Sequence, residues 1–317
     1  MPKFLEFNYE GDYSPEGIVG FSYKLYIPSG YKKGTKTPLL VMIHGCDQTP
    51  DVFAAGTRMN ELAEKENFIV LYPAHPIQVE LGNPDGCWLW FYDQNLHRGK
   101  GGEPDIIVGM IHEVKKKYSI DSNRIYAAGL SSGAAMTVNL GVTYPDIFCG
   151  IGICSGLEYH AADMQELDNP LIAMDKGGLD PYECGNMAFQ EMGKYKRKMP
   201  VIVFHGTSDT TVHPINAQQL ITQWSQTNFL VDGKTGKVEI APAMVKTDIV
   251  NEKSYLQNVY NDPSGSPLIE LWLVNGMSHA WSGGSADGTY TDTQGPVASS
   301  IIWNFFTKHD LGGFSTK

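Results

Sequence analysis

The sequence predicts an α/β protein, in which a mostly parallel central sheet carries helices on both faces. Short continuous apolar runs, typical of strands buried on both faces, alternate along the chain with segments whose apolar residues recur at helical spacing. Such alternation requires right-handed crossovers between parallel strands. The 317 residues, 42% of them hydrophobic, suffice for one sizeable core. We therefore expect a single domain over residues 1–317.

The elements of this fold can be located in chain order from the apolar pattern. The first strand alternates between apolar and polar residues like an outer strand, whereas the later ones are mostly continuous apolar runs. The expected strands are 21–27, 38–43, 68–72, 125–128, 148–154, 200–204 and 268–274. The expected helices are 51–65, 103–118, 134–140, 214–226 and 296–308. Helix 103–118 is the clearest, because its apolar residues form one face.

Two stretches do not fit the alternation and are interpreted as insertions. Segment 156–199 is rich in Met, Asp, Gly and Tyr and follows the strand after the central motif described below, so it is the candidate for a lid. Segment 228–267 contains the turn pairs Asp232-Gly233 and Thr235-Gly236, which favour a hairpin.

Composition excludes several classes of function. The net charge of −11 argues against a nucleic-acid partner, because the only basic clusters are 115–117 and 194–198. No apolar run approaches the length that spans a bilayer, and Met1 is not followed by a signal-peptide pattern. We therefore expect a soluble chain, either leaderless or already processed.

The cysteines give little support to a metal or redox site. Cys46, Cys87, Cys149, Cys154 and Cys184 show no C-x-x-C spacing, so we expect no metal and no cofactor. An odd number leaves at least one thiol free, and disulfides among the others stay open at this point. Cys149 and Cys154 border or lie in an apolar run and are expected to be small core residues.

The central motif is Gly129-Leu-Ser-Ser-Gly133, which lies between the apolar strand 125–128 and the helix 134–140. This is a G-x-S-x-G pattern, in which glycines let a helix start directly against a strand while the serine sits on a strained turn with its hydroxyl exposed. The five letters alone also occur in ordinary turns. The strand before them and the helix after them favour Ser131 as a nucleophile.

A serine needs a base to take its proton and a carboxylate to orient that base. With this motif the acid and the histidine should follow the serine, each on a loop after a later strand. Strand 200–204 runs into Asp209, and strand 268–274 runs into His279. We therefore predict Ser131, Asp209 and His279 as catalytic residues.

Each assignment has competitors. Asp209 could cap a loop, and His279 could be a surface histidine. Among the other histidines, His205 still lies at its strand end and precedes the acid, and His309 follows the last helix. His44 precedes the serine, so it has another role, and together with Gly45 it is predicted to bind substrate.

The oxyanion formed during acyl transfer needs backbone N–H donors aimed at it. One should come from Ser132, the residue after the nucleophile, and the second from Cys46, in the loop after strand 38–43. His44 and Gly45 precede that donor, and the glycine lets backbone approach a bound substrate. An ordinary tight turn is the alternative interpretation of His44-Gly45.

Taken together, these motifs resemble those of the polyhydroxybutyrate depolymerase family of esterases, and the resemblance covers most of the chain. One departure is Ala134, where the family usually has a second glycine. The motifs are His44-Gly-Cys-Asp-Gln48, Cys87-Trp-Leu-Trp-Phe91, Gly129-Leu-Ser-Ser-Gly-Ala-Ala-Met136, His205-Gly-Thr-Ser-Asp-Thr-Thr-Val212, Gly276-Met-Ser-His-Ala-Trp-Ser-Gly-Gly284 and Gly288-Thr-Tyr-Thr-Asp292.

The resemblance implies the α/β-hydrolase fold, a Ser-Asp-His triad and a disulfide between Cys46 and Cys87 that braces the oxyanion loop. Because many members are secreted, it also implies an extracellular location, with the cytoplasm as the alternative. Aromatic residues in the motif loops are expected to wall an apolar cleft, and Trp90 and Trp281 are the two predicted as substrate contacts.

The predicted function is a cofactor-free serine esterase acting on short-chain hydroxyalkanoate polyester or its oligomers. Within enzymes, the alternative is a feruloyl or acetyl xylan esterase of the same family. Outside enzymes, the alternative is a binding module that has this fold but no catalytic activity. Absence of labelling by a serine-reactive phosphonate would favour that alternative. The expected partner is an ester substrate, small, oligomeric or polymeric, and neither nucleic acid nor membrane; the sequence leaves the oligomeric state open.

Overall fold

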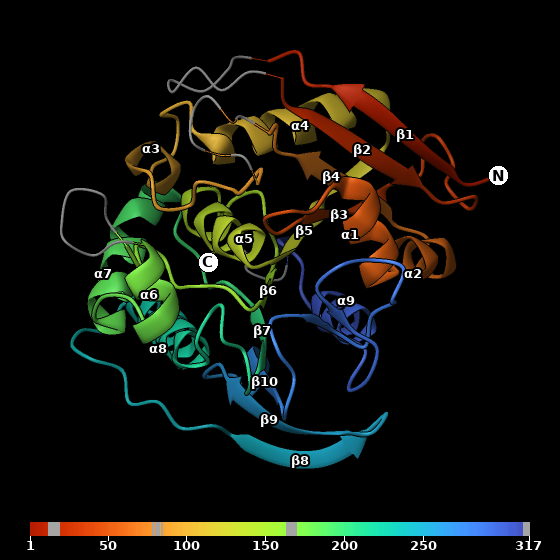
Figure 1. Cartoon of the computed structure of the whole chain (residues 1–317). Coiled ribbons are helices and arrows are strands. Elements are labelled where there is room, and N and C mark those ends of the chain that lie inside the picture. The colour runs from red at the N-terminus through yellow and green to blue at the C-terminus, as the bar shows by residue number, and fades with distance from the viewer. Residues whose placement is uncertain (12–19, 78, 80–82, 84, 163–169, 313–317) are drawn as a thin grey trace.

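Ten strands of the described residues form one sheet, in the order β1-β2-β4-β3-β5-β6-β7-β10-β9-β8 (Figure 1). This computed structural model describes residues 1–11, 20–77, 79, 83, 85–162 and 170–312. All pairings from β4 to β10 are parallel, and both edges of the sheet are antiparallel. The sheet strands are β1 (Lys3–Asn8), β2 (Ser22–Ile27), β3 (Thr37–Ile43), β4 (Ile69–Ala74), β5 (Ile120–Leu130), β6 (Ile151–Cys154), β7 (Val201–Gly206), β8 (Met244–Val250), β9 (Lys253–Asn261) and β10 (Pro267–Val274).

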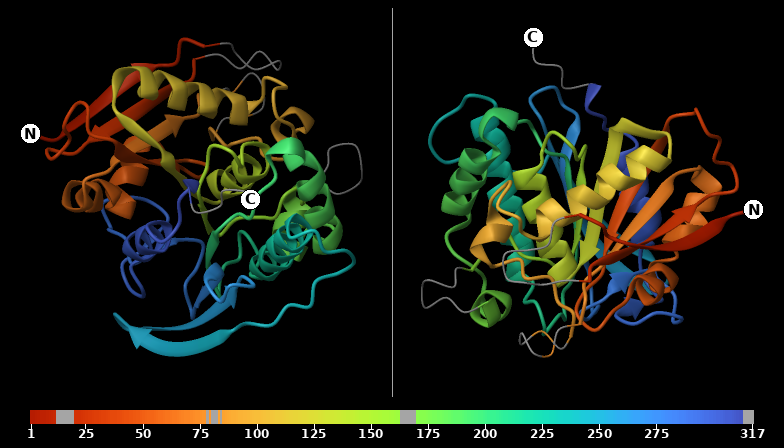
Figure 2. Two further views of the ribbon diagram at one scale, coloured as in Figure 1. Left: turned by 180° about the vertical axis from the view of Figure 1, so that it is seen from behind. Right: turned by 90° about the horizontal axis from the view of Figure 1, so that it is seen from above.

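Helices cover both faces of this sheet, as the two views in Figure 2 show. One core cluster joins the sheet to α4, α5, α7 and α8, and a second joins it to α1, α2 and α9. The helices are α1 (Pro50–Thr57), α2 (Met59–Glu66), α3 (Asp93–Leu96), α4 (Glu103–Lys117), α5 (Ser132–Thr143), α6 (Pro170–Lys176), α7 (Pro181–Met192), α8 (Ile215–Val231) and α9 (Ala298–Phe306), with a 3₁₀ turn at Gly193–Tyr195. The predicted α/β class is confirmed.

The expected helix 51–65 is two helices, because the chain turns at Arg58, which has φ 54°. A continuous helix would use the carbonyls of Gly56 and Thr57 for its own hydrogen bonds. Here the Gly56 carbonyl accepts from the Ser285 amide at 2.7 Å, and the Thr57 carbonyl accepts from the Ser299 hydroxyl at 2.6 Å. Contacts with the C-terminal part of the chain therefore end the first helix.

Segment 228–267 extends the central sheet by two strands. It continues α8, crosses to the sheet edge and forms β8 and β9. The hairpin turn is Asn251-Glu252, both with positive φ (47° and 69°), and joins β8 directly to β9. The turn predicted at 232–233 instead ends α8, and the one at 235–236 lies in the connection to β8.

Segment 156–199 supplies α6 and α7, and α7 packs along α8 and against α5. Residues 163–169 of the candidate lid lie outside the described part of the chain. Among the helices described, none combines the length and the apolar character needed to cross a membrane.

Candidate active site

The predicted catalytic residues follow three parallel strands that end at the same edge of the sheet. Ser131 directly follows β5, Asp209 follows β7 and His279 follows β10. In the sheet, β5, β6, β7 and β10 are consecutive and parallel. The order of strands thus gathers residues that are up to 148 positions apart (279 − 131) at one edge of the molecule.

Ser131 lies on a sharp turn between β5 and α5. Its φ of 58° and ψ of −124° are unusual for a residue with a side chain, and its amide donates to the Cys154 carbonyl at 3.0 Å. Both motif glycines are needed for this turn. A Cβ on Gly129 would lie 2.3 Å from the Gly133 carbonyl oxygen, and one on Gly133 would lie 2.2 Å from the Ile43 carbonyl oxygen. The glycines therefore allow α5 to begin against β3 and β5.

Asp209 and His279 are in direct contact: His279 Nδ1 lies 2.8 Å from Asp209 Oδ2. The other carboxylate oxygen accepts from the amides of Thr211 and Val212, each at 2.9 Å. The loops that carry the two residues also touch, since the Ser208 amide donates to the Met277 carbonyl. The carboxylate can therefore fix the tautomer and orientation of the His279 ring.

His205, which was not predicted as the catalytic base because it precedes the acid, also lies beside this carboxylate. Its Nε2 is 3.4 Å from Asp209 Oδ2 and donates to the Val212 carbonyl at 2.8 Å. Burial raises the pKa of Asp209, but hydrogen bonds from His205 and His279 lower it more, so the pKa lies well below its ordinary value. Asp209 is thus held as a buried anion.

Ser131 and His279 are both partly exposed to solvent. The described residues include no hydrogen bond between the Ser131 hydroxyl and the His279 ring. Such bonds are often formed only with substrate in place. Tyr290, 43% exposed, packs edge-on to His279 with ring centroids 6.1 Å apart. From the sequence, Tyr290 was only one of several aromatic residues in the motif loops that could wall a cleft.

The loop after β3 faces the nucleophile turn and is closed by Gln48. The Gly45 amide donates to Gln48 Oε1 at 2.9 Å, so it is not free for a substrate. A Cβ on Gly45 would lie 3.2 Å from Ser131 Cβ, which shows how closely the loop approaches the turn. Among the described residues, the amides of Cys46 and Ser132 have no hydrogen-bond acceptor. These two amides are the donors available for an oxyanion.

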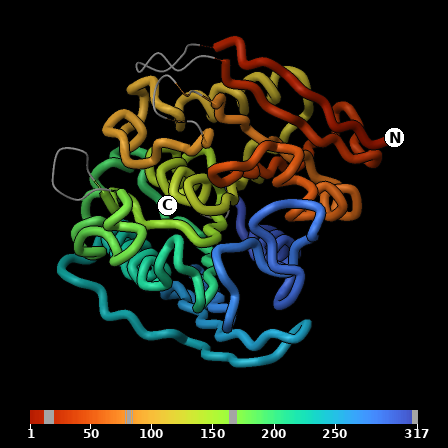
Figure 3. Tube along the Cα trace, viewed as in Figure 1, coloured from red at the N-terminus to blue at the C-terminus, as the bar shows by residue number. Residues whose placement is uncertain are grey.

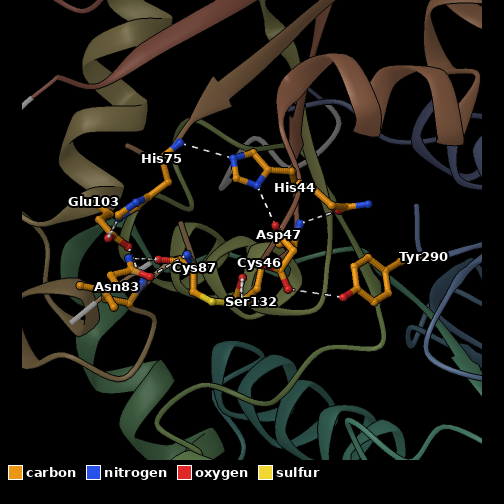
Figure 4. Close-up of a disulfide and its surroundings, with 12 residues drawn as sticks. His44, Cys46, Asp47, His75, Asn83, Cys87, Glu103, Ser132 and Tyr290 are labelled. Carbon is orange, nitrogen blue, oxygen red and sulfur yellow. Dashed lines mark hydrogen bonds and ion pairs between the residues drawn. A yellow bond between two sulfur atoms is a disulfide. The ribbon is translucent and has the colours of Figure 1, made fainter. Parts of the chain in front are cut away.

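Cys46 is held from the side by a disulfide to Cys87, as Figure 4 shows. The Cα atoms of the two residues are 4.4 Å apart. The pairing implied by the family resemblance is therefore confirmed. Cys46 Sγ also lies 3.4 Å from the hydroxyl of Ser132, so the two residues that carry the predicted oxyanion donors touch through their side chains. Asn83 fixes the other end, because its side chain bonds both the amide and the carbonyl of Cys87.

A second brace runs through two histidines and a buried acid on the opposite side of the loop (Figure 4). The His75 amide donates to His44 Nε2 at 3.3 Å, and His75 Nε2 lies 2.8 Å from Glu103. Glu103 also accepts from the Leu89 amide, two residues after Cys87. Together with the disulfide, these contacts form a closed ring around the loop.

His44 is 1% exposed, and its Nδ1–H donates to the Gly45 carbonyl at 2.8 Å. Burial lowers the pKa of His44 to about 4, although the hydrogen bond to Gly45 acts in the opposite direction. Both ring nitrogens are occupied in the neutral form. The structure thus corrects the expectation that His44 and Gly45 meet substrate: the ring and the glycine amide brace the loop instead.

The two tryptophans predicted as cleft walls also lie elsewhere. Trp281 is fully buried, donates to the Ser299 hydroxyl at 3.0 Å and packs edge-on against Phe53. Trp90 is 4% exposed, and its carbonyl accepts from Asn139 of α5. A side chain packed in the core has no surface left for a ligand, so the structure gives both residues a packing role.

The remaining cysteines are free and buried: Cys149, Cys154 and Cys184. This confirms the expected core role of Cys149 and Cys154. Within the residues that the structure describes, no three His, Cys, Asp or Glu side chains form a group able to hold a metal ion.

Comparison with known proteins finds several esterases that are similar to this chain. The chain is 32% identical over 80% of its length to poly(3-hydroxyalkanoate) depolymerase C of Paucimonas lemoignei, and the match spans 57% of that protein. It is 31% identical over 80% of its length to feruloyl esterase B of Neurospora crassa, covering 81% of that protein. It is 30% identical over 64% of its length to a probable acetylxylan esterase A of Aspergillus flavus, covering 66% of that protein.

Solved structures confirm the fold. An acetyl xylan esterase from Aspergillus awamori superposes with a TM-score of 0.73 at 21% identity, covering 97% of this chain and 99% of that one. The family model described as "Esterase PHB depolymerase" matches residues 21–241. The chain therefore belongs to the polyhydroxybutyrate (PHB) depolymerase family of esterases, carboxylic ester hydrolases with the α/β-hydrolase fold.

Proposed function

We propose that this chain is a serine esterase in which Ser131 attacks the ester carbonyl and His279 takes its proton. The hydrogen bond between His279 and Asp209 carries the proposal, because it leaves the other ring nitrogen free to act as base and then as acid. The amides of Cys46 and Ser132 hold the oxyanion. Ser131 is acylated first, while the alcohol of the ester leaves with a proton from His279; water, deprotonated by His279, then hydrolyses the acyl-enzyme and releases the acid.

The substrate class that we favour is a short-chain hydroxyalkanoate polyester or its oligomers. Support comes from the family model and from the depolymerase of Paucimonas lemoignei. That match spans 57% of the relative, so the name of that relative does not decide between a polymer and an oligomer as the substrate of this chain.

A feruloyl or acetyl xylan ester is the second candidate. The observation in its favour is coverage, since the match to feruloyl esterase B spans 81% of that relative. Tyr290, exposed beside His279 and within 3.5 Å of Asp47, offers an aromatic ring and a hydroxyl next to the proposed base.

Purified protein decides between these substrates. Release of product from 3-hydroxybutyrate oligomers, methyl ferulate and acetylated xylan should be compared as kcat/KM on one preparation. A higher value on the oligomers supports the first candidate, and a higher value on either plant ester supports the second. No turnover of any ester, with no labelling of Ser131 by a phosphonate, would overturn the esterase proposal itself.

We further propose that the whole chain is one catalytic domain, with α6 and α7 of segment 156–199 as the candidate lid. The disulfide between Cys46 and Cys87 supports an oxidising, extracellular location, because the cytoplasm keeps thiols reduced. Following the protein in culture medium and cell fractions of its natural producer tests this location.

A further inference from the structure

Strand β8 is the free edge of the central sheet and is exposed along its whole length. Among the strands that the structure describes, it pairs only with β9, and all seven of its residues are exposed. Four of them are large and apolar: Met244, Val245, Ile249 and Val250. A long apolar edge strand is open to pairing with another chain. Figure 3 shows this hairpin along the outer side of the molecule.

The unpaired backbone groups of β8 can be identified from its neighbours. The Ser254 carbonyl accepts from the Asn275 amide, so the backbone of Ser254 faces away from β8 and that of Tyr255 faces β8. Tyr255 is opposite Asp248. Because peptide groups alternate in direction along a strand, Val245, Thr247 and Ile249 present their N–H and C=O groups outward.

One further contact agrees with this assignment. The Ile249 amide donates to the carboxylate of Asp248 at 2.9 Å, so it takes no part in the pairing with β9. Asp248 in turn lies 3.0 Å from Lys246, and both side chains are about half exposed. An exposed ion pair of this kind contributes little to stability, so both side chains can be redirected at small cost.

The sequence of β8 is complementary to itself when reversed about Thr247. In an antiparallel pair centred there, Met244 lies opposite Val250, Val245 opposite Ile249, and Lys246 opposite Asp248. Apolar residues therefore meet apolar residues, and each cation meets an anion. The Lys246–Asp248 positions are non-hydrogen-bonded pairs, in which side chains are closest. A lysine on an edge strand usually discourages pairing, but here the opposite position carries its counter-ion.

We propose that β8 binds β8 of a second copy of this chain, antiparallel about a twofold axis through Thr247. The outward N–H and C=O groups of Val245, Thr247 and Ile249 form the hydrogen bonds, and the two sheets become continuous. The self-complementary charges select a second copy over an unrelated strand, since one symmetric patch must match itself in a twofold dimer. Seven residues give an interface below roughly 1,200 Å², a size typical of weak, transient association.

Sedimentation velocity across a range of protein concentrations tests the proposal. The mass should rise from the 35.0 kDa of one chain toward twice that value as concentration increases. Lys246→Asp alone and Asp248→Lys alone each place two pairs of like charges across the axis, and should weaken dimerisation at least tenfold. The double swap restores opposite charges at both pairs and should restore the dimer.

Two outcomes would overturn the proposal: a monomer at every concentration, or a dimer that neither single reversal weakens. Thr247→Cys checks the axis directly, because the two copies of residue 247 face each other and should crosslink under mild oxidation. Ester hydrolysis by each variant serves as the control for folding, since β8 lies outside the proposed catalytic residues. A double swap that stays as weak as the single reversals would also contradict the charge pairing.

Discussion

The two halves of the candidate site are positioned by different means. Ser131, Asp209 and His279 follow strands of one parallel sheet, so backbone pairing in the core fixes their loops. The loop from His44 to Gln48 also follows a strand, but side chains from distant segments determine its shape. The first half thus depends on the fold as a whole, whereas the second depends on a few specific contacts.

This difference teaches where the site can be changed without unfolding the protein. Gly129 and Gly133 are tightly packed against backbone. A Cβ atom added at either position would lie 2.2–2.3 Å from a carbonyl oxygen, so substitution there disturbs the sheet itself. The oxyanion loop, by contrast, is held by the disulfide to Cys87 and by the side-chain contacts of Gln48. Altering them should reduce transition-state stabilisation while the residues on the strand ends keep their places.

The largest effect is expected from the half positioned by the sheet. Ser131→Ala should lower kcat/KM on a short-chain p-nitrophenyl ester by about 10³ or more, because nucleophile, base and acid act as a unit. Ser132→Ala is the matched control and should keep most activity, since only its backbone amide is needed. If Ser132→Ala were the inactive variant, the assignment of the nucleophile would be wrong.

A smaller but clear effect should follow from releasing the braced loop. Loss of a whole oxyanion donor costs about 10² to 10³ in kcat, so Cys87→Ser, which only loosens the loop, should cost roughly 10- to 100-fold. It should also lower the melting temperature, because closing a loop of this length contributes about 4 kcal/mol in the chain-entropy model.

Cys149→Ser is the control for the loss of a cysteine elsewhere. Cys149 is free and its thiol donates to the Asn123 carbonyl at 2.7 Å, a contact that serine can keep. Activity and melting temperature should change little. Equal losses in Cys87→Ser and Cys149→Ser would show that the disulfide has no particular link to the oxyanion loop.

Gln48 connects the oxyanion loop to the segment that carries Tyr290, and its substitution should have an intermediate effect. Its Oε1 accepts from Gly45, and its Nε2 donates to the Thr289 carbonyl at 2.9 Å, beside Tyr290. Gln48→Ala should lower kcat by about tenfold through the loosened loop. Gln48→Glu keeps the acceptor for Gly45 and loses the donor to Thr289. A Glu variant as impaired as the Ala variant would place the importance of Gln48 in the Thr289 contact.

The smallest effect on activity is expected from His44, whose contribution appears in the pH dependence of stability. Burial lowers its pKa to about 4 in the folded protein, against about 6.5 when unfolded. As the pH falls below 6.5, the unfolded chain gains a proton that the folded chain excludes, so stability falls. The loss between pH 7 and pH 5 should be about 2 kcal/mol.

Urea unfolding at those two pH values measures the effect. His44→Gln removes the titrating ring, so the variant should lose about 2 kcal/mol less than the wild type over the same interval. Other buried groups, such as His309, contribute equally to both proteins and cancel in the difference. An identical pH dependence in both proteins would contradict the buried neutral state of His44.

The sequence by itself determined the fold class and the placement of Ser131, Asp209 and His279. Apolar periodicity and the order of strands are local features, and parallel strands necessarily end at the same edge. The G-x-S-x-G pattern located the sharp turn, because only glycine fits where α5 meets β3 and β5. The Cys46–Cys87 bond came from the family resemblance and could not be derived from spacing.

Only the tertiary structure decided what surrounds these positions. The break at Arg58 arises because Ser285 and Ser299 take carbonyls that a continuous helix would use. Trp281 is buried for a similar reason, because Phe53, which lies 228 positions earlier in the chain (281 − 53), packs edge-on against it. No local pattern encodes a contact between residues hundreds of positions apart.

The braces of the oxyanion loop belong to the same category. His44, His75 and Glu103 carry no motif that links them, and Gln48 meets Thr289 across 241 positions. Their roles depend on which side chains the folded sheet and its loops bring within hydrogen-bond distance. The sequence therefore predicts the residues that sit on the scaffold, and the folded chain decides which side chains hold the loop that faces them.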